Sequence, residues 1–130
     1  MIPRFRAWDK EFKEMVQVDA LVFDEQIIKA TYKNGNVVKE DLKNYVLMQS
    51  TGLRDKNDRE IFDGDILKVT NLASWLEVVS FNENKAMFVS KETKSGVEET
   101  PLYDLFNTDI FEVEIVGNIH TNPDLAEVKQ

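Results

Sequence analysis

The stretch TGLRDKNDREIFDGDILKV, residues 51–69, places two groups of turn-forming residues between apolar runs. Asp and Asn side chains hydrogen-bond to their own backbone and tolerate the left-handed conformation, so Asp55–Asp58 predicts a turn. Glu60–Phe62 then predicts a short strand, Asp63-Gly64 a second turn and Asp65–Val69 a longer strand. We therefore interpret the regularly spaced charges as the hydrophilic ends and outer face of a tight β-hairpin.

The same residue types also occur in metal loops and nucleotide sites, but neither template fits this stretch. An EF-hand calcium loop needs acidic or amide ligands at positions 1, 3 and 5, glycine at 6 and glutamate at 12. Counted from Asp55, position 5 is Arg59, position 6 is Glu60 and position 12 is Ile66. The five glycines never lie closer together than twelve residues, which excludes the glycine-rich phosphate loops. We expect no metal ion and no cofactor.

The rest of the chain consists mainly of short runs rich in β-branched and aromatic residues, separated by turn signals. Further strands are expected over Arg4–Trp8, Met15–Val18, Leu21–Phe23, Ile27–Tyr32, Val37–Val38, Tyr45–Met48, Leu76–Phe81, Ala86–Val89 and Phe111–Val116. Asn34-Gly35 is the strongest short hairpin signal, and Gly96 marks another turn. In residues 111–116 strict alternation should turn Phe111, Val113 and Ile115 to the core and the glutamates to solvent.

These runs predict a mainly β protein, either a small barrel or a packed-sheet fold with SH3-like character and one or two short helices. We expect a single domain over residues 1–123 and a frayed tail over residues 124–130. One helical turn is expected within Lys39–Asn44, and a short helix over Pro101–Phe106 with Thr100 as its N-cap.

Composition limits the classes of function. The chain has 130 residues, no cysteine and a net charge of −8. Residues 98–130 carry eight acidic residues against Lys129 alone, and such a field repels the phosphates of nucleic acids. A local basic patch remains conceivable at Arg4, Arg6 and Lys10, beside Trp8. No apolar run is long enough for a membrane span, and the N-terminus does not resemble a secretory signal.

Catalytic candidates are few. His120 is the only histidine and has Thr121 and Asn122 beside it, so a solvated or capping histidine is the favoured interpretation over a general base. No G-x-S-x-G motif surrounds a serine. Glu112 and Glu114 share one face of a strand, and are better explained as cross-strand partners of lysines than as an acid–base pair. We expect no catalytic residues and no enzymatic activity.

Three blocks carry a family resemblance: Arg4–Asp9 followed by Met15, then Met48–Ile66, and finally Ile115–His120 with Asn122–Leu125. On these blocks the sequence resembles the YopX family of phage and prophage proteins. The resemblance implies a predominantly β fold encoded in phages and prophages of mainly Gram-positive bacteria, and it implies no catalytic residue. The signature residues, which we expect to be structural, are Arg6, Trp8, Gly52, Leu53, Asp55, Lys56, Asn57, Glu60, Ile61, Gly64, Asp65, Gly117, Asn118, Ile119, Asn122 and Pro123.

The chain departs from the family pattern at three positions. Asp58 replaces the glycine of a D-K-N-G turn, and aspartate can adopt the left-handed conformation at some energetic cost. Phe62 and Asp63 stand where the family often has tyrosine and glutamate, so a role that depends on a phenol hydroxyl is disfavoured at Phe62.

From the sequence we infer a small cytoplasmic protein that binds a protein partner. The partner is a second copy of the chain in a homo-oligomer, a host factor or a phage factor. A speculative interaction surface comprises Trp75, Glu112 and Glu114, with Trp75 in a loop-like stretch over residues 71–75. Trp75 is better explained as covering the core than as an exposed anchor. A basic partner would suit the acidic end of the chain, so lysine at Glu112 and Glu114 should weaken the contact. The alternatives are a nucleic-acid-binding barrel and, least favoured, an enzyme with a scattered acidic site.

Overall fold

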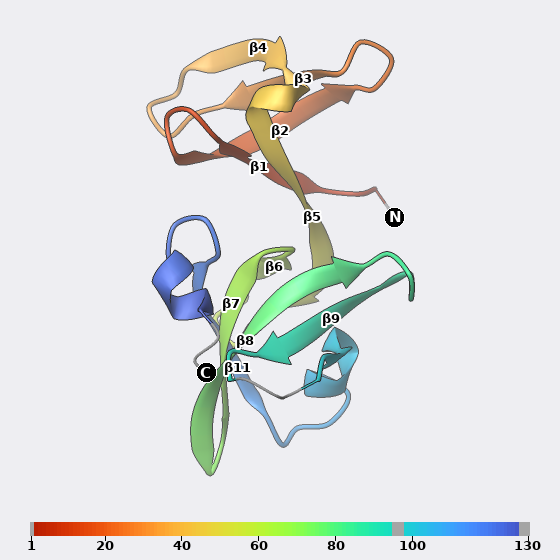
Figure 1. Cartoon of the computed structure of the whole chain (residues 1–130), viewed down its shortest axis with the longest axis vertical. Coiled ribbons are helices and arrows are strands. Elements are labelled where there is room, and N and C mark those ends of the chain that lie inside the picture. The colour runs from red at the N-terminus through yellow and green to blue at the C-terminus, as the bar shows by residue number, and fades with distance from the viewer. Residues whose placement is uncertain (1, 95–97, 128–130) are drawn as a thin grey trace. The chain divides into compact units, whose positions relative to one another are not determined.

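The computed structural model describes residues 2–94 and 98–127, and these residues form two open antiparallel sheets (Figure 1). Backbone contacts divide the chain into two compact units, residues 1–50 and residues 51–130. The strands are β1 (Phe5–Asp9), β2 (Glu14–Val22), β3 (Ile27–Thr31), β4 (Val37–Asp41), β5 (Tyr45–Arg54), β6 (Glu60–Phe62), β7 (Asp65–Asn71), β8 (Ala73–Asn82), β9 (Met87–Glu92), β10 (Thr100–Pro101) and β11 (Glu112–Asn118). One sheet has the order β4-β3-β2-β1-β5-β6 and the other β10-β9-β8-β7-β11.

The prediction of a mainly β protein is confirmed, but the barrel alternative is wrong. In the described part of the chain both strand orders are linear, so each sheet ends in two edge strands instead of closing on itself. The edges are protected in other ways. Strand β4 carries Lys39, Glu40 and Asp41, charges that discourage edge-to-edge pairing, and β10 has only two residues. The SH3-like character stays a prediction.

In the first unit, three successive hairpin connections build the sheet from β1 to β4, and the first half of β5 pairs with β1. The predicted Asn34-Gly35 turn is present between β3 and β4, where Gly35 has φ +89° and the Asn34 side chain accepts the Asn36 amide. A bulge in β2 lies between Val18 and Ala20. The core of the unit consists of Ala7, Val16, Ile28, Ala30 and Tyr45.

In the second unit, β7, β8 and β9 form a meander, and β11 returns to pair with the other side of β7. The core consists of Ile61, Leu67, Val69, Val79, Leu102, Leu105 and Val113. The alternation predicted for residues 111–116 is confirmed, because Val113 is buried while Phe111 and Ile115 pack against the core. Glu112 is exposed and Glu114 is half-buried.

Helical structure is short and of the 3-10 type: η1 (Leu42–Asn44), η2 (Leu102–Leu105) and η3 (Pro123–Ala126). The first two lie within the regions where helices were expected. Thr100 is not the N-cap, because Thr100 and Pro101 form β10 and pair with β9. The C-terminal tail predicted over residues 124–130 begins inside η3, while residues 128–130 lie outside the described residues, as does the Gly96 turn.

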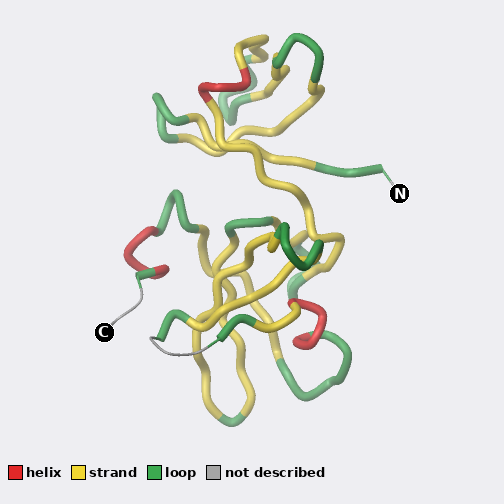
Figure 2. The backbone as a smooth tube through the Cα atoms, turned by 45° about the vertical axis from the view of Figure 1, so that its right-hand side comes forward, coloured by secondary structure: helices red, strands yellow, loops and turns green. Residues whose placement is uncertain are grey.

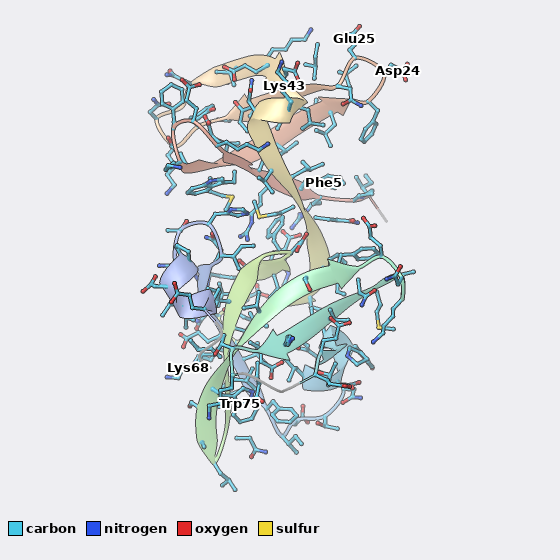
Figure 3. All side chains as sticks on the ribbon, viewed as in Figure 1. Phe5, Asp24, Glu25, Lys43, Lys68 and Trp75 are labelled. Carbon is cyan, nitrogen blue, oxygen red and sulfur yellow. The ribbon has the colours of Figure 1, made fainter. Side chains whose placement is uncertain are left out.

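The prediction of a loop over residues 71–75 is wrong. Strands β7 and β8 continue to the end of a tight hairpin in which Asn71 pairs with Ala73 across Leu72 (Figure 2). Trp75 therefore lies on β8, as Figure 3 shows, half-buried against the core. Leu72 is fully exposed and has φ +62°, a left-handed conformation that strains bulky side chains.

We predict that Leu72→Gly stabilises the second unit, because glycine adopts the left-handed conformation without a Cβ clash and the exposed leucine contributes no burial. The free energy of unfolding should rise by about 1 kcal/mol. Chemical denaturation monitored by tryptophan fluorescence measures this change, with Leu72→Ala as the matched control that removes the side chain but keeps the strain. Equal effects of the two variants would contradict the strained turn.

Candidate functional site

The turn between β5 and β6 is organised by the carboxylate of Asp55, whose side chain is completely buried. One oxygen, Oδ1, accepts the backbone amides of Asn57 and Arg59, both at 2.9 Å. Backbone bonds close the turn, since the Asp55 amide donates to the Arg59 carbonyl and Asp58 follows in the left-handed conformation with φ +62°. The hairpin predicted for this stretch is confirmed, and Asp58 tolerates the position where the family has glycine.

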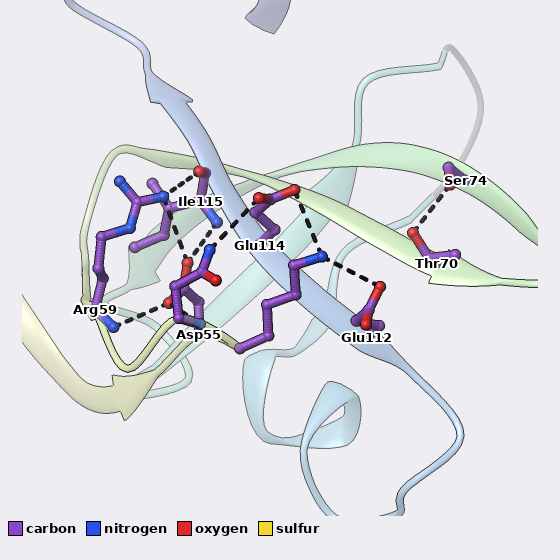
Figure 4. A network of polar contacts seen from close by, with 9 residues as sticks. Asp55, Arg59, Thr70, Ser74, Glu112, Glu114 and Ile115 are labelled. Atoms are coloured by element: carbon purple, nitrogen blue, oxygen red, sulfur yellow. Dashed lines mark hydrogen bonds and ion pairs between the residues drawn. The ribbon is translucent and has the colours of Figure 1, made fainter.

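The same turn is fastened to β11. The second oxygen of Asp55, Oδ2, accepts the amide of Ile115 at 2.9 Å, and the Lys56 amide donates to the Val113 carbonyl at 2.8 Å. The guanidinium of Arg59 reaches the Ile115 carbonyl and lies 3.5 Å from the Asp55 carboxylate (Figure 4). Backbone groups on the edge of β11 that face away from β7 are thereby satisfied. We call residues 55–59 with their contacts to β11 the Asp55 clamp.

Ion pairs extend the clamp on its surface. The Lys56 ammonium lies 3.4 Å from a Glu112 oxygen and 3.9 Å from a Glu114 oxygen (Figure 4). The side-chain amide of Asn57 donates to the Glu114 carboxylate. The two glutamates do pair with a lysine, but not with a cross-strand one as the sequence suggested. The lysine comes from the turn, although Lys68 on β7 lies directly opposite Glu114 in the sheet.

The electrostatics of Asp55 follow from this geometry. Burial alone would raise the pKa of the Asp55 carboxyl, but the amides of Ile115, Arg59 and Asn57 and the Arg59 guanidinium favour the ionised form. The net result is a pKa below the ordinary value. The carboxylate therefore stays charged at neutral pH, and backbone amides and the Arg59 guanidinium occupy its hydrogen-bond acceptor positions. Such a group serves as a structural anchor and is unsuited to bind a metal ion or to accept a proton from a substrate.

The third signature block forms a second fastening at the end of β11. The Asn118 side chain accepts the amides of His120 and Thr121, and the Asn122 amide donates back to the Asn118 carbonyl at 2.8 Å. Gly117 sits at a bulge in β11, where a Cβ atom would come within 2.4 Å of the Asn122 side chain. The turn containing His120 is therefore a folded connection into η3, which agrees with the structural interpretation of that histidine.

Hydrogen bonds join the central signature block, Met48–Ile66, to the block that begins with Ile115–His120. The Ile119 amide donates to the Gly64 carbonyl at 2.9 Å, and the Gly64 amide donates to the Val79 carbonyl. Asp65, which is 1% exposed, accepts the Phe62 amide through its side chain. Of the remaining signature residues, Arg6 and Trp8 lie on β1, Gly52 and Leu53 on β5, Glu60 and Ile61 on β6, and Pro123 opens η3.

A cleft of about 470 Å³ lies beside the clamp. Its apolar lining comprises Leu105, Phe106, Phe111, Val113 and the exposed Ile110. Its polar lining consists of Arg54, Asp55, Lys56, Thr70, Thr108, Asp109 and Glu112. The clamp therefore fixes one wall of the cleft, and the loop between η2 and β11 supplies the other. No sequence motif signals this cleft, because its walls come from segments about fifty residues apart.

Two further buried carboxylates, Glu77 and Asp9, accept hydrogen bonds from groups within their own units. On β8, Glu77 accepts the Trp75 indole N–H at 2.7 Å and the Ser90 hydroxyl at 2.6 Å. Trp75 also meets Phe111 edge-on at 6.1 Å between ring centres. Trp75 of the predicted interaction surface is thus tied to the core through both its indole N–H and its ring, whereas Glu112 stays exposed.

In the first unit, Asp9 organises the turn after β1 by accepting the amides of Glu11 and Phe12. Its other oxygen accepts the Tyr32 hydroxyl, and the Tyr32 and Tyr45 hydroxyl oxygens lie 2.7 Å apart. Burial raises the pKa of both tyrosines, while the Tyr32 hydroxyl and the two amides bring the pKa of Asp9 below its ordinary value although burial opposes this shift. This polar network links three strands and was not expected from the sequence.

The predicted basic patch has contacts of its own. Arg4, Arg6 and Trp8 each take part in an interaction within the chain, and the Lys10 ammonium donates to the Lys43 carbonyl at 2.9 Å. Within residues 2–94 and 98–127, no group of three or more His, Asp or Glu side chains is placed to hold a metal ion. None of the helices in that part of the chain is long and apolar enough to cross a bilayer.

Comparison with known proteins agrees with the signature. The chain belongs to the YopX protein family, whose model matches residues 4–127. It is also similar to a crystal structure of protein EF1440 from Enterococcus faecalis, with a TM-score of 0.65 and 27% sequence identity over 98% of this chain and 99% of that chain. No curated protein sequence matches the chain. The family resemblance read from the three blocks is therefore confirmed.

We predict that Asp55→Asn lowers the free energy of unfolding by about 3 kcal/mol, because the amide would direct N–H groups against backbone amides in a buried site. Asp58→Asn is the matched control. It makes the same chemical change three residues away, where the side chain is 88% exposed, and should leave stability nearly unchanged. Denaturant titration of both variants tests the clamp, and a similar small effect in both would contradict it.

Asp55 and Asp9 also predict the direction of acid destabilisation. Their pKa values are lower in the folded than in the unfolded state, so their contribution is complete above the unfolded value of about 3.9. It is lost as the pH falls through the folded values. The free energy of unfolding should therefore decline below about pH 5. The decline should be shallower in Asp55→Asn, and parallel curves for wild type and variant would show that Asp55 is not linked to folding.

Proposed function

We propose that the protein is a non-enzymatic protein-binding module and that the cleft beside the Asp55 clamp is its contact surface. The observation that carries this proposal is the position of Ile110, which is 59% exposed at the mouth of a cleft with an apolar floor. Exposed apolar side chains next to a rigid wall are typical of surfaces where a partner places an anchoring residue.

The charges around the cleft favour a basic partner. The charged residues that line the cleft are two cations, Arg54 and Lys56, and three carboxylates, Asp55, Asp109 and Glu112. Asp109 forms no ion pair within the described part of the chain. A partner segment with an apolar side chain and a nearby lysine or arginine would complement both the floor and this excess negative charge.

The non-enzymatic part of the proposal rests on how the acidic side chains are used. Asp55 is saturated by backbone amides, Asp9 by amides and Tyr32, and Glu77 by Trp75 and Ser90. Each of these groups stabilises its own unit, and none presents a free lone pair to the cleft as a proton acceptor. Family membership and the resemblance behind it support an origin in a phage or prophage and a role in the bacterial cytoplasm.

Nucleic-acid binding is the weaker alternative. The entire excess of negative charge lies in the second unit, where residues 51–130 have sixteen acidic against eight basic residues. Residues 1–50 are neutral, with eight of each, and their basic N-terminal side chains already have contacts within the chain. Neutralisation of phosphates, which supplies most of the affinity for nucleic acids, has little support in this distribution.

We predict that Ile110→Asp and Asp109→Lys each abolish capture of a specific partner from a nuclease-treated lysate of the native host. Aspartate removes the apolar anchor, and lysine repels a basic segment. Leu72→Ser and Glu83→Lys are matched controls, because they make comparable changes at exposed positions outside the cleft. Quantitative mass spectrometry of material enriched on the four variants and on the wild type provides the measurement.

The partner identified in this way must then bind the purified wild type in isothermal titration and bind the two cleft variants at least tenfold more weakly. Equal recovery on all five proteins would contradict the cleft as contact surface. Recovery only when nucleic acid is left intact would favour the nucleic-acid alternative.

A further inference from the structure

The first unit carries a surface that its own fold leaves unpartnered. On the side of the sheet away from the core, β2, β3 and β4 line a shallow groove of about 340 Å³. Its lining, all exposed or half-exposed, consists of Ala20, Val22, Ile27, Lys29, Val37, Val38 and Lys39, which we call the basic face. Val22 is 41% exposed and Val37 is 57% exposed, so the face combines apolar area with two cations.

The two lysines occupy an unfavourable arrangement. Lys29 and Lys39 lie directly opposite each other on neighbouring strands, where like charges destabilise an isolated sheet. Within the residues the structure describes, neither ammonium forms a hydrogen bond or an ion pair. Lys29 interacts electrostatically with Asp19, whose carboxylate is already bonded by Thr31 and Gln17. A carboxylate placed between the two lysines from outside would relieve this repulsion.

The second unit presents a complementary surface. The segment from Tyr103 to Ile110, which we call the acidic loop, contains the last three residues of η2 and most of the connection into β11. Tyr103 is 62% exposed and Ile110 59% exposed, and Asp104 and Asp109 are exposed beside them without an ion pair in the described structure. Two apolar side chains and two carboxylates thus project from a loop, while the basic face offers apolar side chains from all three of its strands and two ammonium groups.

We propose that the chain associates with itself head to tail, with the acidic loop of one copy seated on the basic face of the next. This inference rests on the proposed function, since it names a second copy as a partner for the surface around Ile110 and Asp109. The separation of charge argues for this occupant, because the basic face belongs to a neutral unit and the whole net charge of −8 belongs to the unit that carries the acidic loop.

Head-to-tail contacts have a consequence for assembly. The two surfaces in the contact are different, so an open assembly always keeps a free acidic loop at one end and a free basic face at the other unless a ring closes. Association should therefore increase progressively with protein concentration. It should weaken when salt is raised from about 0.05 M to about 0.5 M, because the contact depends on exposed charges.

The test is sedimentation of the full chain and of two variants, Lys29→Glu/Lys39→Glu, which reverses the charge of the basic face, and Asp104→Asn/Asp109→Asn, which neutralises the acidic loop. Each variant alone lacks one half of every contact, so its association constant should fall at least tenfold below that of the wild type. An equimolar mixture retains one intact contact, between the acidic loop of the first variant and the basic face of the second. The mixture should form a 1:1 dimer that does not grow further. Lys13→Glu/Lys33→Glu, which changes two exposed lysines on turns outside the groove, is the charge-matched control and should associate like the wild type.

A wild type that stays monomeric at millimolar concentration and low salt would overturn the inference, as would a mixture that stays monomeric while the wild type associates. Neither result touches the proposed function if a different partner still binds through Ile110. If the wild type self-associates but binds no other protein, the head-to-tail contact stands and the proposal of a module for other partners fails.

Discussion

The second unit depends on one buried carboxylate. Asp55 satisfies two amides of its own turn and one amide of β11, so a single side chain both shapes the hairpin and holds the turn against the edge strand. The three bonds and the Arg59 guanidinium outweigh the desolvation of the charge, since the pKa of Asp55 is lowered in spite of complete burial. Edge strands invite unwanted pairing, and here the turn covers the edge of β11 where a further strand could otherwise have added.

The clamp also explains why the family signature consists of widely separated blocks. Its central block supplies the turn and its last block supplies β11 and the Gly117–Pro123 connection, and the two are joined through Asp55, Ile115, Gly64 and Ile119. These signature residues therefore build a scaffold, and the cleft lies beside it. The clamp fixes one wall of the cleft, and Ile110 belongs to the loop that forms the other wall.

Local chemistry predicted much of the fold. Turn residues placed the β5–β6 and β3–β4 hairpins, and alternation placed the inward face of β11, because these signals act over a few residues. The sequence did not reveal the bond from Asp55 to Ile115, which spans sixty residues, or the cleft, which joins distant segments. The sequence predicted a loop around Trp75, because leucine is not a residue that normally forms a tight hairpin turn. Leu72 nevertheless occupies the left-handed position of such a turn. A small barrel was one of the two folds expected, because many exposed strand edges would be a liability, but two open sheets with charged or covered edges form instead.

The central claim is that the turn and β11 behave as one cooperative unit. Native-state amide hydrogen exchange followed by NMR tests it most directly, at the amides of Asn57, Arg59 and Ile115 that donate to Asp55. The account predicts that all three exchange only through global unfolding, with free energies equal to those of core amides such as Val69. Rapid exchange at Asn57 and Arg59 through local opening, while Val69 stays protected, would show that the turn is an ordinary exposed loop and would contradict the account.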